Sequence, residues 1–342
     1  MNFPTVAIAI LNYNGRNYLE KFLPSVVATS YPNKKIVVAD NGSADDSIAF
    51  LKLNFPSVEI ILLDNNYGFA GGYNKALKQV ESDYYILLNS DVEVPANWVA
   101  DLIALMESDK QIAACQPKIL SYTEKNKFEH AGACGGWIDT LGYPFARGRI
   151  FDVCEEDHGQ YDRNEKIFWA TGAALCISAE RFNEMNGFDH YLFAHMEEID
   201  LCWRLQRKGY LIYCCASSAV YHLGGGTLHK SNSRKTYLNF RNNLIILLKN
   251  FSFSEAIWKI PLRILMDWLF AFKSLLQKDA PSFKAIFKAH GSVVKWVFTH
   301  QPKQKLPSFK INKLHGVYKS SLVWGYFIKK KRHFSEIIKA GE

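Results

Sequence analysis

The chain has 342 residues, of which 48% are hydrophobic and 14% aromatic, and its formal net charge is +8. This composition supplies a core for one large domain or two smaller ones, and it excludes a disordered or collagen-like chain. No uncharged apolar run reaches about 18 residues, and residues 1–12 lack the basic-then-apolar order of a secretory signal. We therefore expect a cytosolic protein, or one attached to a membrane surface.

The positive charge is concentrated in the C-terminal part. Residues 241–342 contain 19 Lys and Arg against 5 Asp and Glu, so this segment carries +14 and residues 1–240 carry −6. Such asymmetry predicts two parts with different partners: a front domain, 1–240, and a basic tail, 241–342. The tail is expected to face an anionic surface such as lipid headgroups or nucleic acid.

The first hundred residues alternate between short apolar runs and longer stretches with helical periodicity. The runs predict strands at Val6–Leu11, Lys35–Ala39, Val58–Leu62 and Tyr84–Leu88. The stretches predict helices at Tyr18–Ala28, Ser47–Leu53, Ala70–Val80 and Trp98–Met106. Continuously apolar strands separated by helices are typical of a parallel sheet covered on both faces. The pattern predicts an α/β, Rossmann-like, doubly wound domain with its ligand crevice at the carboxyl ends of the strands.

Periodicity is mixed in the middle of the chain. It predicts strands near Lys118–Leu120, Phe168–Ile177 and Leu211–Cys215, and a helix from Glu198 to Gln206 that Gly209 ends. In the tail, amphipathic helices are predicted at Leu244–Leu248, Ile260–Leu276, Ile286–Phe298 and Leu322–Ile328, with Pro302 and Pro307 as breaks. Trp and Phe close to lysine on these helices favour an anionic membrane surface. A helical cap on the front domain is the alternative, and no nucleic-acid-binding module is recognisable.

Each of the four predicted strands is followed by polar residues or glycine. The segments are Asn12-Tyr13-Asn14-Gly15, Asp40-Asn41-Gly42-Ser43, Asn65-Asn66-Tyr67-Gly68 and Asn89-Ser90-Asp91. Turn chemistry explains any one of them, because Asn, Asp and Gly tolerate left-handed conformations and bond to their own backbone. Four such segments on one rim of a sheet indicate a polar ligand.

Particular residues on this rim suit a nucleotide and a metal. Asp91 offers a carboxylate where Mg²⁺ or Mn²⁺ bridges phosphates, with a simple turn before Pro95 as the alternative. Asp40 suits ribose hydroxyls or a base edge, and the glycine-rich Gly68–Asn74 segment allows close approach of the backbone to a ligand. No G-x-G-x-x-G follows the first strand, which argues against a nicotinamide dehydrogenase.

Three carboxylates, Glu197, Glu198 and Asp200, occupy four positions at a predicted helix start. Their repulsion predicts a raised pKa for at least one, as a general base requires. Favourable interaction with the helix dipole is the alternative explanation. His222, which precedes a glycine run at 224–226, is a metal-ligand candidate or a structural histidine.

In this order the motifs resemble family 2 glycosyltransferases with the GT-A fold, and most of all the bacterial rhamnosyltransferase-like enzymes. The resemblance covers residues 5–245. The matching motifs are Asn12-Tyr13-Asn14, Asp40-Asn41-Gly42-Ser43-x-Asp45, Asn66-x-Gly68-Phe69-Ala70-Gly71-Gly72-x-Asn74, Asn89-Ser90-Asp91, Thr171-Gly172-Ala173 and Glu197-Glu198-x-Asp200-Leu201-x-x-Arg204.

The resemblance implies a nucleotide-sugar site and a divalent metal. Asp40 would contact uridine or thymidine and Asn12 would line the base pocket. The residues that would shape the nucleotide-sugar loop are Asn66, Gly68 and Asn74. Asn89-Ser90-Asp91 takes the place of the family's D-x-D motif, so Asp91 would hold Mg²⁺ or Mn²⁺. His222, in a Tyr-His-x-Gly context, would be a second ligand.

The resemblance also implies a base and an acceptor side. Glu197-Glu198 takes the place of the family's Glu-Asp pair, so Glu198 would be the base and Glu197 its substitute. Arg204 would support the diphosphate or pair with the carboxylates. The acceptor side would be lined by Trp169, Thr171 and Gly172.

The implied activity is inverting, metal-dependent transfer of a sugar from a UDP- or dTDP-sugar, dTDP-rhamnose among them. The acceptor would be a hydroxyl of a glycan or lipid-linked glycan in surface polysaccharide synthesis, at the inner face of the cytoplasmic membrane. A catalytically inactive scaffold that binds nucleotide sugar or glycan is the alternative. A nucleotidyltransferase fits less well, because Asn12–Arg16 lacks the glycine-rich basic loop that such enzymes carry after the first strand.

Overall fold

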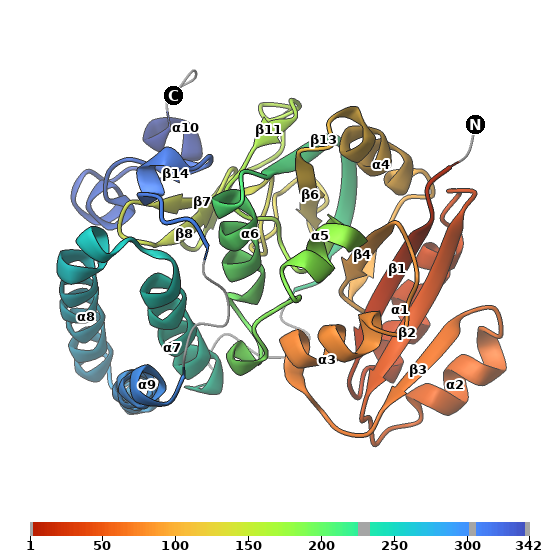
Figure 1. The fold of residues 1–342 in the computed structure, drawn as a ribbon, viewed down its shortest axis with the longest axis horizontal. Coiled ribbons are helices and arrows are strands. Elements are labelled where there is room, and N and C mark those ends of the chain that lie inside the picture. Colours follow the sequence, from red (N-terminus) through yellow and green to blue (C-terminus); the bar gives the residue numbers. More distant parts are fainter. Residues whose placement is uncertain (1–2, 225–232, 301–305, 339–342) are drawn as a thin grey trace.

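The computed structural model describes residues 3–224, 233–300 and 306–338. Its centre is a nine-stranded sheet with the order β11-β13-β6-β12-β4-β1-β2-β3, to which β5 is added beside β13 (Figure 1). The strands of this sheet are β1 (Val6–Asn12), β2 (Lys34–Asn41), β3 (Glu59–Leu63), β4 (Tyr84–Leu88), β5 (Val92–Glu93), β6 (Ile112–Ser121), β11 (Glu165–Lys166), β12 (Ala174–Ser178) and β13 (Leu211–His222).

Helices cover both faces of the sheet, as predicted. Successive side chains of β1, β2 and β4 point to opposite faces of the sheet, and each face has its own hydrophobic core. Ala7 and Ala9 pack on the side of α3, whereas Ile8 and Ile10 pack on the side of α1 and α4. The helices are α1 (Arg16–Val27), α2 (Ser47–Asn54), α3 (Gly68–Leu77), α4 (Trp98–Ser108), α5 (Ala179–Glu184), α6 (Glu197–Arg207), α7 (Ser233–Asn250), α8 (Phe253–Leu276), α9 (Ala280–Thr299) and α10 (Phe334–Ile337).

Strands β3, β2, β1 and β4 run parallel, and their register aligns the polar strand ends. Asn12 lies opposite Asp40, and Ile10 lies opposite Leu88, so that Asn89 and Ser90 continue along the same rim. Beyond β4 the sheet is mixed, because β12 runs antiparallel to both β4 and β6. The four strands predicted in the first hundred residues are therefore confirmed.

The strand predicted at Phe168–Ile177 is wrong in its first half. Only Ala174–Ser178 forms a strand, β12. The preceding backbone bonds elsewhere: the Phe168 amide donates to the Gly136 carbonyl at 2.8 Å and the Thr171 amide donates to the Gln116 side chain at 2.9 Å. These long-range partners hold residues 168–173 as a loop, which sequence periodicity does not reveal.

A smaller sheet and the C-terminal helices complete the fold. The five-stranded sheet consists of β10 (Val153–Cys154), β9 (Arg149–Ile150), β8 (Pro144–Ala146), β7 (Gly136–Asp139) and β14 (Val317–Tyr318). Figure 1 shows α7 between α6 and the outer helix α8. The division predicted at residues 240 and 241, which stays a prediction, falls inside α7. Within the described ranges, no helix has both the length and the apolar content to span a bilayer.

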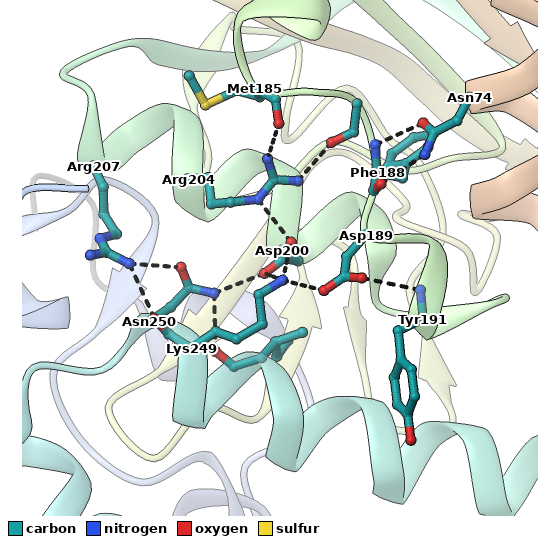
Figure 2. A network of polar contacts seen from close by, with 12 residues as sticks. Asn74, Met185, Phe188, Asp189, Tyr191, Asp200, Arg204, Arg207, Lys249 and Asn250 are labelled. Carbon is teal, nitrogen blue, oxygen red and sulfur yellow. Dashed lines mark hydrogen bonds and ion pairs between the residues drawn. The ribbon is translucent and has the colours of Figure 1, made fainter. Parts of the chain in front are cut away.

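One buried carboxylate, Asp200 of α6, joins α6 to α7 and to the loop before it (Figure 2). It accepts hydrogen bonds from Arg204 Nε at 2.9 Å, Lys249 Nζ at 2.9 Å and Asn250 Nδ2 at 3.0 Å. Lys249 also reaches Asp189 at 2.7 Å. Burial alone would raise the pKa of Asp200, but the charges of Lys249 and Arg204 lower it well below its usual range.

We expect Asp200→Asn to lower the free energy of unfolding by about 3–5 kcal/mol, because Lys249 and Arg204 would lose the charge that compensates them in a buried site. Urea unfolding followed by circular dichroism measures this loss. Lys110→Met is the control, since Lys110 pairs with Glu107 at 3.0 Å with 78% of its side chain exposed. Its cost should stay below about 1 kcal/mol. Equal losses in the two variants would contradict the assigned role of Asp200.

Candidate active site

The first polar cluster lies at the ends of β1 and β2. Asn12 Nδ2 donates to Asp40 Oδ1 at 3.0 Å and to Ser43 Oγ at 3.2 Å, and the Ser43 amide donates to Asp40 Oδ2 at 3.0 Å. Asn12 and Asp40 are both buried. Asn12 Oδ1 is buried and has no hydrogen-bond partner in the described part of the chain, so this acceptor is left unsatisfied.

The second cluster shapes the entry to α3. Asn41 Oδ1 accepts from the Tyr67 amide at 3.0 Å, and Asn66 Oδ1 accepts from the Gly68 amide at 2.9 Å. Gly68 has φ +70°, and a Cβ there would lie 2.5 Å from the carbonyl oxygen of Phe193. Only glycine therefore permits this turn to touch the loop before α6. Asn41 was not among the predicted site residues, although its position next to Asp40 at a strand end was a signal.

Asn74 and Arg204 bind the backbone that leads to α6. The Asn74 side chain donates to the Phe188 carbonyl at 2.8 Å and accepts from the Phe188 amide at 2.9 Å. Arg204 donates to Asp200 and, at 2.8 Å each, to the carbonyls of Met185 and Gly187 (Figure 2). Arg204 thus has the second of its two expected roles, pairing with a carboxylate. Its contact with a diphosphate stays a prediction.

The third cluster joins Asp91 to His222, which lie far apart in the sequence. His222 Nε2 is 3.2 Å from Asp91 Oδ1 and 3.4 Å from Asn89 Nδ2, while His222 Nδ1 is 2.9 Å from Glu129 Oε2. Burial lowers the pKa of His222, but the two carboxylates outweigh it and raise the pKa to about 10. Glu129 lies in a stretch without clear periodicity, and no sequence signal singled it out.

The donor set suits a hard or borderline divalent cation that a diphosphate also binds. One carboxylate oxygen and one imidazole nitrogen lie within 3.2 Å of each other, and Glu129 holds the other ring nitrogen. Among the described residues, no group of three or more His, Cys, Asp or Glu side chains is arranged to hold a metal ion alone. Two protein donors leave coordination positions for phosphate oxygens and water, as Mg²⁺ requires.

The loop that leads into α6 has a strained backbone. Phe193, His195 and Met196 all have positive φ, between 64° and 74°. Such residues cost about 1–3 kcal/mol each and persist only where surrounding contacts hold them. The Ala70 amide of α3 donates to the Phe193 carbonyl at 3.1 Å and provides one of these contacts. The strained loop directly precedes the carboxylates of Glu197 and Glu198.

Glu197 and Glu198 both have raised pKa values. Burial raises the pKa of Glu198 to about 7, while burial and the neighbouring charge of Glu198 raise that of Glu197 well above its usual range. Burial, rather than the predicted repulsion, is the larger cause. Glu197 is buried and Glu198 is the more exposed residue of the two, although Glu198 Oε2 is itself buried without a hydrogen-bond partner among the described residues. His195 beside them is neutral, because burial and the charge of Lys235 lower its pKa to about 4.

Helix α7 clamps the strained loop from the C-terminal side. Asn242 Nδ2 lies 2.8, 2.9 and 2.7 Å from the carbonyl oxygens of Leu192, Ala194 and His195. Arg241 Nη2 donates to the Leu192 carbonyl at 3.0 Å. The predicted tail therefore begins with residues that hold the loop before Glu198. Sequence analysis missed them, because nothing in the pattern of a helix shows which distant carbonyls its side chains meet.

The residues predicted to bind the acceptor belong to a loop between α6 and the strand ends. Trp169 is buried and its Nε1 donates to the Trp137 carbonyl at 3.0 Å, and Thr171 is also buried. A Cβ on Gly172 would lie 2.8 Å from the ring of Phe69. The Ala170 amide lies 3.5 Å from Cys202 Sγ, one helical turn after Glu198. The loop thus reaches both α3 and α6, and its role in binding an acceptor stays a prediction.

Comparison with known sequences identifies the family. The profile described as Glycosyl transferase family 2 matches residues 7–160. A Bacillus subtilis (strain 168) protein named as a teichuronic acid biosynthesis glycosyltransferase, TuaG, is 30% identical over 227 residues, which cover 61% of this chain and 87% of that protein. The chain belongs to glycosyl transferase family 2. It is similar over 80% of its length, at 24% identity, to N-acetylglucosaminyl-diphospho-decaprenol L-rhamnosyltransferase of Mycobacterium tuberculosis (strain ATCC 25618 / H37Rv), 92% of which is covered.

Solved structures confirm the fold of this family 2 glycosyltransferase. GalNAc-T7, crystallised with UDP, GalNAc and Mn²⁺, superposes with a TM-score of 0.58 at 16% identity, covering 88% of this chain and 58% of that one. The mannosyltransferase PcManGT from Pyrobaculum calidifontis, with GDP-Man and Mn²⁺, gives 0.53 at 12% identity, covering 88% and 77%. The predicted GT-A fold and rhamnosyltransferase-like sequence are both confirmed, and the enzyme transfers a sugar.

In this family 2 glycosyltransferase we expect Asn242→Ala to lower kcat by at least about tenfold, because catalytic groups displaced by about 1 Å lose rate steeply. Donor affinity should change little, since Asn242 contacts none of the polar strand ends. Steady-state kinetics and calorimetry measure the two effects.

The matched control is Asn243→Ala on the same helix. Asn243 is also buried, but its amide donates to the Gly142 carbonyl at 3.1 Å, away from the strained loop. If both variants lost kcat equally, general destabilisation rather than the clamp would explain the loss.

Proposed function

We propose that this glycosyltransferase transfers a sugar, with inversion, from a UDP- or dTDP-sugar to a hydroxyl of a glycan or lipid-linked glycan. The observation that carries the proposal is that one GT-A fold contains a buried polar cluster at Asn12 and Asp40, a carboxylate–imidazole pair at Asp91 and His222, and a carboxylate with a raised pKa at Glu198. The rhamnosyltransferase relative favours dTDP-rhamnose as the donor and a lipid-linked acceptor in cell-envelope polysaccharide synthesis.

Asn12 and Asp40 bind the nucleoside in this proposal. Uracil and thymine carry one N–H donor between two carbonyl groups, and the buried, unpaired Oδ1 of Asn12 is an acceptor for such a donor. Asp40, whose oxygens are already fixed by Asn12 and Ser43, offers its remaining lone pairs to ribose hydroxyls. The Gly68 amide donates to the Asn66 side chain, and this bond fixes the loop that covers the nucleotide sugar. Asn74 attaches α3 to the backbone at Phe188 through a hydrogen bond to its carbonyl.

Asp91 and His222 would hold Mg²⁺ or Mn²⁺, with positions left for the diphosphate. A bound divalent cation offsets the negative charge that develops as the nucleoside diphosphate leaves. Glu129 accepts a hydrogen bond from His222 Nδ1–H and thereby directs Nε2 toward Asp91. A metal at this position would be bound by the deprotonated Nε2 of His222. Asn89 contacts the same ring, and Ser90 lies near Gly15 on the rim.

Glu198 is the general base. It removes the proton from the acceptor hydroxyl, whose oxygen attacks the anomeric carbon on the face opposite the diphosphate. The new C–O bond forms as the bond to the diphosphate oxygen breaks, so one displacement inverts the anomeric carbon. Glu197 beside Glu198 is buried, and burial and the charge of Lys235 lower the pKa of the nearby His195 to about 4. Trp169, Thr171 and Gly172 line the acceptor side.

We expect the rate to fall as pH drops below about 7, because the pKa of Glu198 is raised to about 7 and only the ionised carboxylate accepts a proton. A pH profile of kcat/KM measures this acid limb. Glu198→Gln should reduce kcat by about 10²–10⁴-fold and remove the limb. If Glu197→Gln had these effects and Glu198→Gln did not, Glu197 would be the base.

We expect Glu129→Gln to weaken Mn²⁺ binding by about 10–100-fold, because the amide no longer fixes the His222 ring as a carboxylate does. Electron paramagnetic resonance of free Mn²⁺, with UDP present, measures the affinity without turnover. Glu93→Gln is the control, since Glu93 of β5 pairs at 2.5 Å with Lys125, an exposed residue in a turn. Unchanged affinity in Glu129→Gln would exclude the orienting role.

The proposal as a whole is tested by nucleoside diphosphate release from a panel of UDP-, dTDP- and GDP-sugars with Mg²⁺ or Mn²⁺. Metal-dependent release from one donor, lost in Asp91→Asn, is expected and would identify the sugar. Absence of release from every donor, together with absence of nucleotide binding by calorimetry, would overturn it in favour of a scaffold. The inner face of the cytoplasmic membrane is the proposed location, with residues 1–240 as the catalytic part and 241–342 as the part directed to the membrane.

A further inference from the structure

Helix α8 is amphipathic, but it buries its charged side and exposes its apolar side, the reverse of what is usual for a helix in contact with water. Between Phe253 and Phe272 its charged residues all point inward, and each is at most 5% exposed. They are Glu255, Lys259, Arg263 and Asp267, spaced four residues apart along one stripe. A helix on the surface of a water-soluble protein normally buries its apolar stripe and exposes its charges.

Partners inside the protein compensate these inward charges. Lys259 Nζ contacts Glu255 Oε1 at 2.7 Å, and the Ile311 amide donates to the same carboxylate at 3.2 Å. Asp267 Oδ2 is 3.3 Å from His290 of α9. The guanidinium of Arg263 lies 3.5 Å from the centroid of the Tyr143 ring. The polar stripe is therefore the structural face of α8, and its orientation is fixed by paired buried charges.

The opposite side of α8 exposes large apolar side chains and no charge before Lys273. It consists of Phe253, Ile257, Trp258, Leu262, Leu265, Trp268, Leu269, Phe270, Phe272, Leu275 and Leu276. Neighbouring elements extend it with Phe287, Val294, Val297 and Phe298 of α9 and with Trp324, Phe327 and Ile328 of the π-helical segment Trp324–Ile328. We call this set the outer apolar face. Phe287 contacts Trp268 and Phe272, so the exposed apolar surface continues from α8 onto α9, and exposed apolar surface of this extent marks an interaction site.

The exposed charge on α8 and α9 beside the outer apolar face is mostly positive, with Asp279 at the turn between the two helices as the exception. From Ala280 to Ser335 the sequence has no Asp or Glu. Exposed lysines follow or flank the face at Lys273, Lys278, Lys284, Lys288 and Lys295. An apolar surface with tryptophan and a lysine rim complements a bilayer with anionic headgroups. A second copy of the same face would instead oppose lysines to lysines, which is unfavourable.

We infer that the outer apolar face of α8 and α9 is seated in the headgroup–acyl boundary of a bilayer that contains anionic lipid. The exposed Trp and Phe rings enter the boundary and the lysines contact lipid phosphates. Helix α7, which packs beside α8 and α9 and clamps the loop before Glu198, links this face to the site. This surface would attach the protein to the membrane at the location proposed above. The test measures lipid binding and does not depend on sugar transfer.

The test is flotation of the full chain with vesicles of phosphatidylcholine alone or mixed with phosphatidylglycerol. Ile257 and Leu269 are each 64% exposed, so Ile257→Asp combined with Leu269→Asp should lower binding to mixed vesicles by at least about tenfold. Leu53→Asp, at a residue of α2 that is 82% exposed, is the matched control and should bind as the wild type does. Lys284→Glu with Lys295→Glu should lower binding to mixed vesicles by about fivefold per lysine, and added salt should have the same effect.

Two outcomes would overturn the inference. One is that the wild type does not float with mixed vesicles, or that Ile257→Asp with Leu269→Asp floats as well as the wild type. The other is a dimer in light scattering that this double variant dissociates, without vesicle binding, since the face would then bind a second copy. Circular dichroism melting and nucleoside diphosphate release show that each variant is folded, so a failed lipid test leaves the proposed sugar transfer unaffected.

Discussion

The fold around the site depends on one buried charge, Asp200. A carboxylate removed from water must be paired, and its partners come from α6 itself and from the end of α7. Pairing therefore fixes α7 against α6. This contact positions Asn242 to donate hydrogen bonds to the carbonyls of the strained loop. The loop in turn determines the position of Glu198 at the start of α6. The C-terminal segment is thus part of the architecture of the active site as well as its neighbour.

The pKa values of three carboxylates within one helical turn are shifted in opposite directions. Asp200 has cationic partners, and its pKa is lowered in spite of burial. Glu197 and Glu198 have no such partners among the described residues, and burial raises their pKa values. The same cluster therefore provides a permanent anion for structure and a carboxylate that titrates near neutral pH. Charge pairing, rather than the spacing of the acids, separates these roles.

Sequence reasoning succeeded where the determining interactions are local or follow a strict register. The strands of the first hundred residues and the polar ends of β1, β2 and β4 were predicted, because apolar runs and turn residues are read directly. It failed at Phe168–Ile177, where bonds to Gly136 and Gln116 replace strand pairing. It also missed Glu129 and Asn242, whose partners are distant in the sequence and leave no periodic signal.

The sequence by itself determined the α/β class, the resemblance to family 2 and the polar rim, since these depend on residue order and on the fixed geometry of parallel strands. The tertiary structure alone decided that His222 meets Asp91, that Glu198 is more accessible than Glu197, and that α8 turns its charges inward. Amphipathicity gives a helix two faces, but only the packing partners determine which face is buried. For α8 those partners are Tyr143, His290 and the Ile311 amide, so the apolar face is left outside.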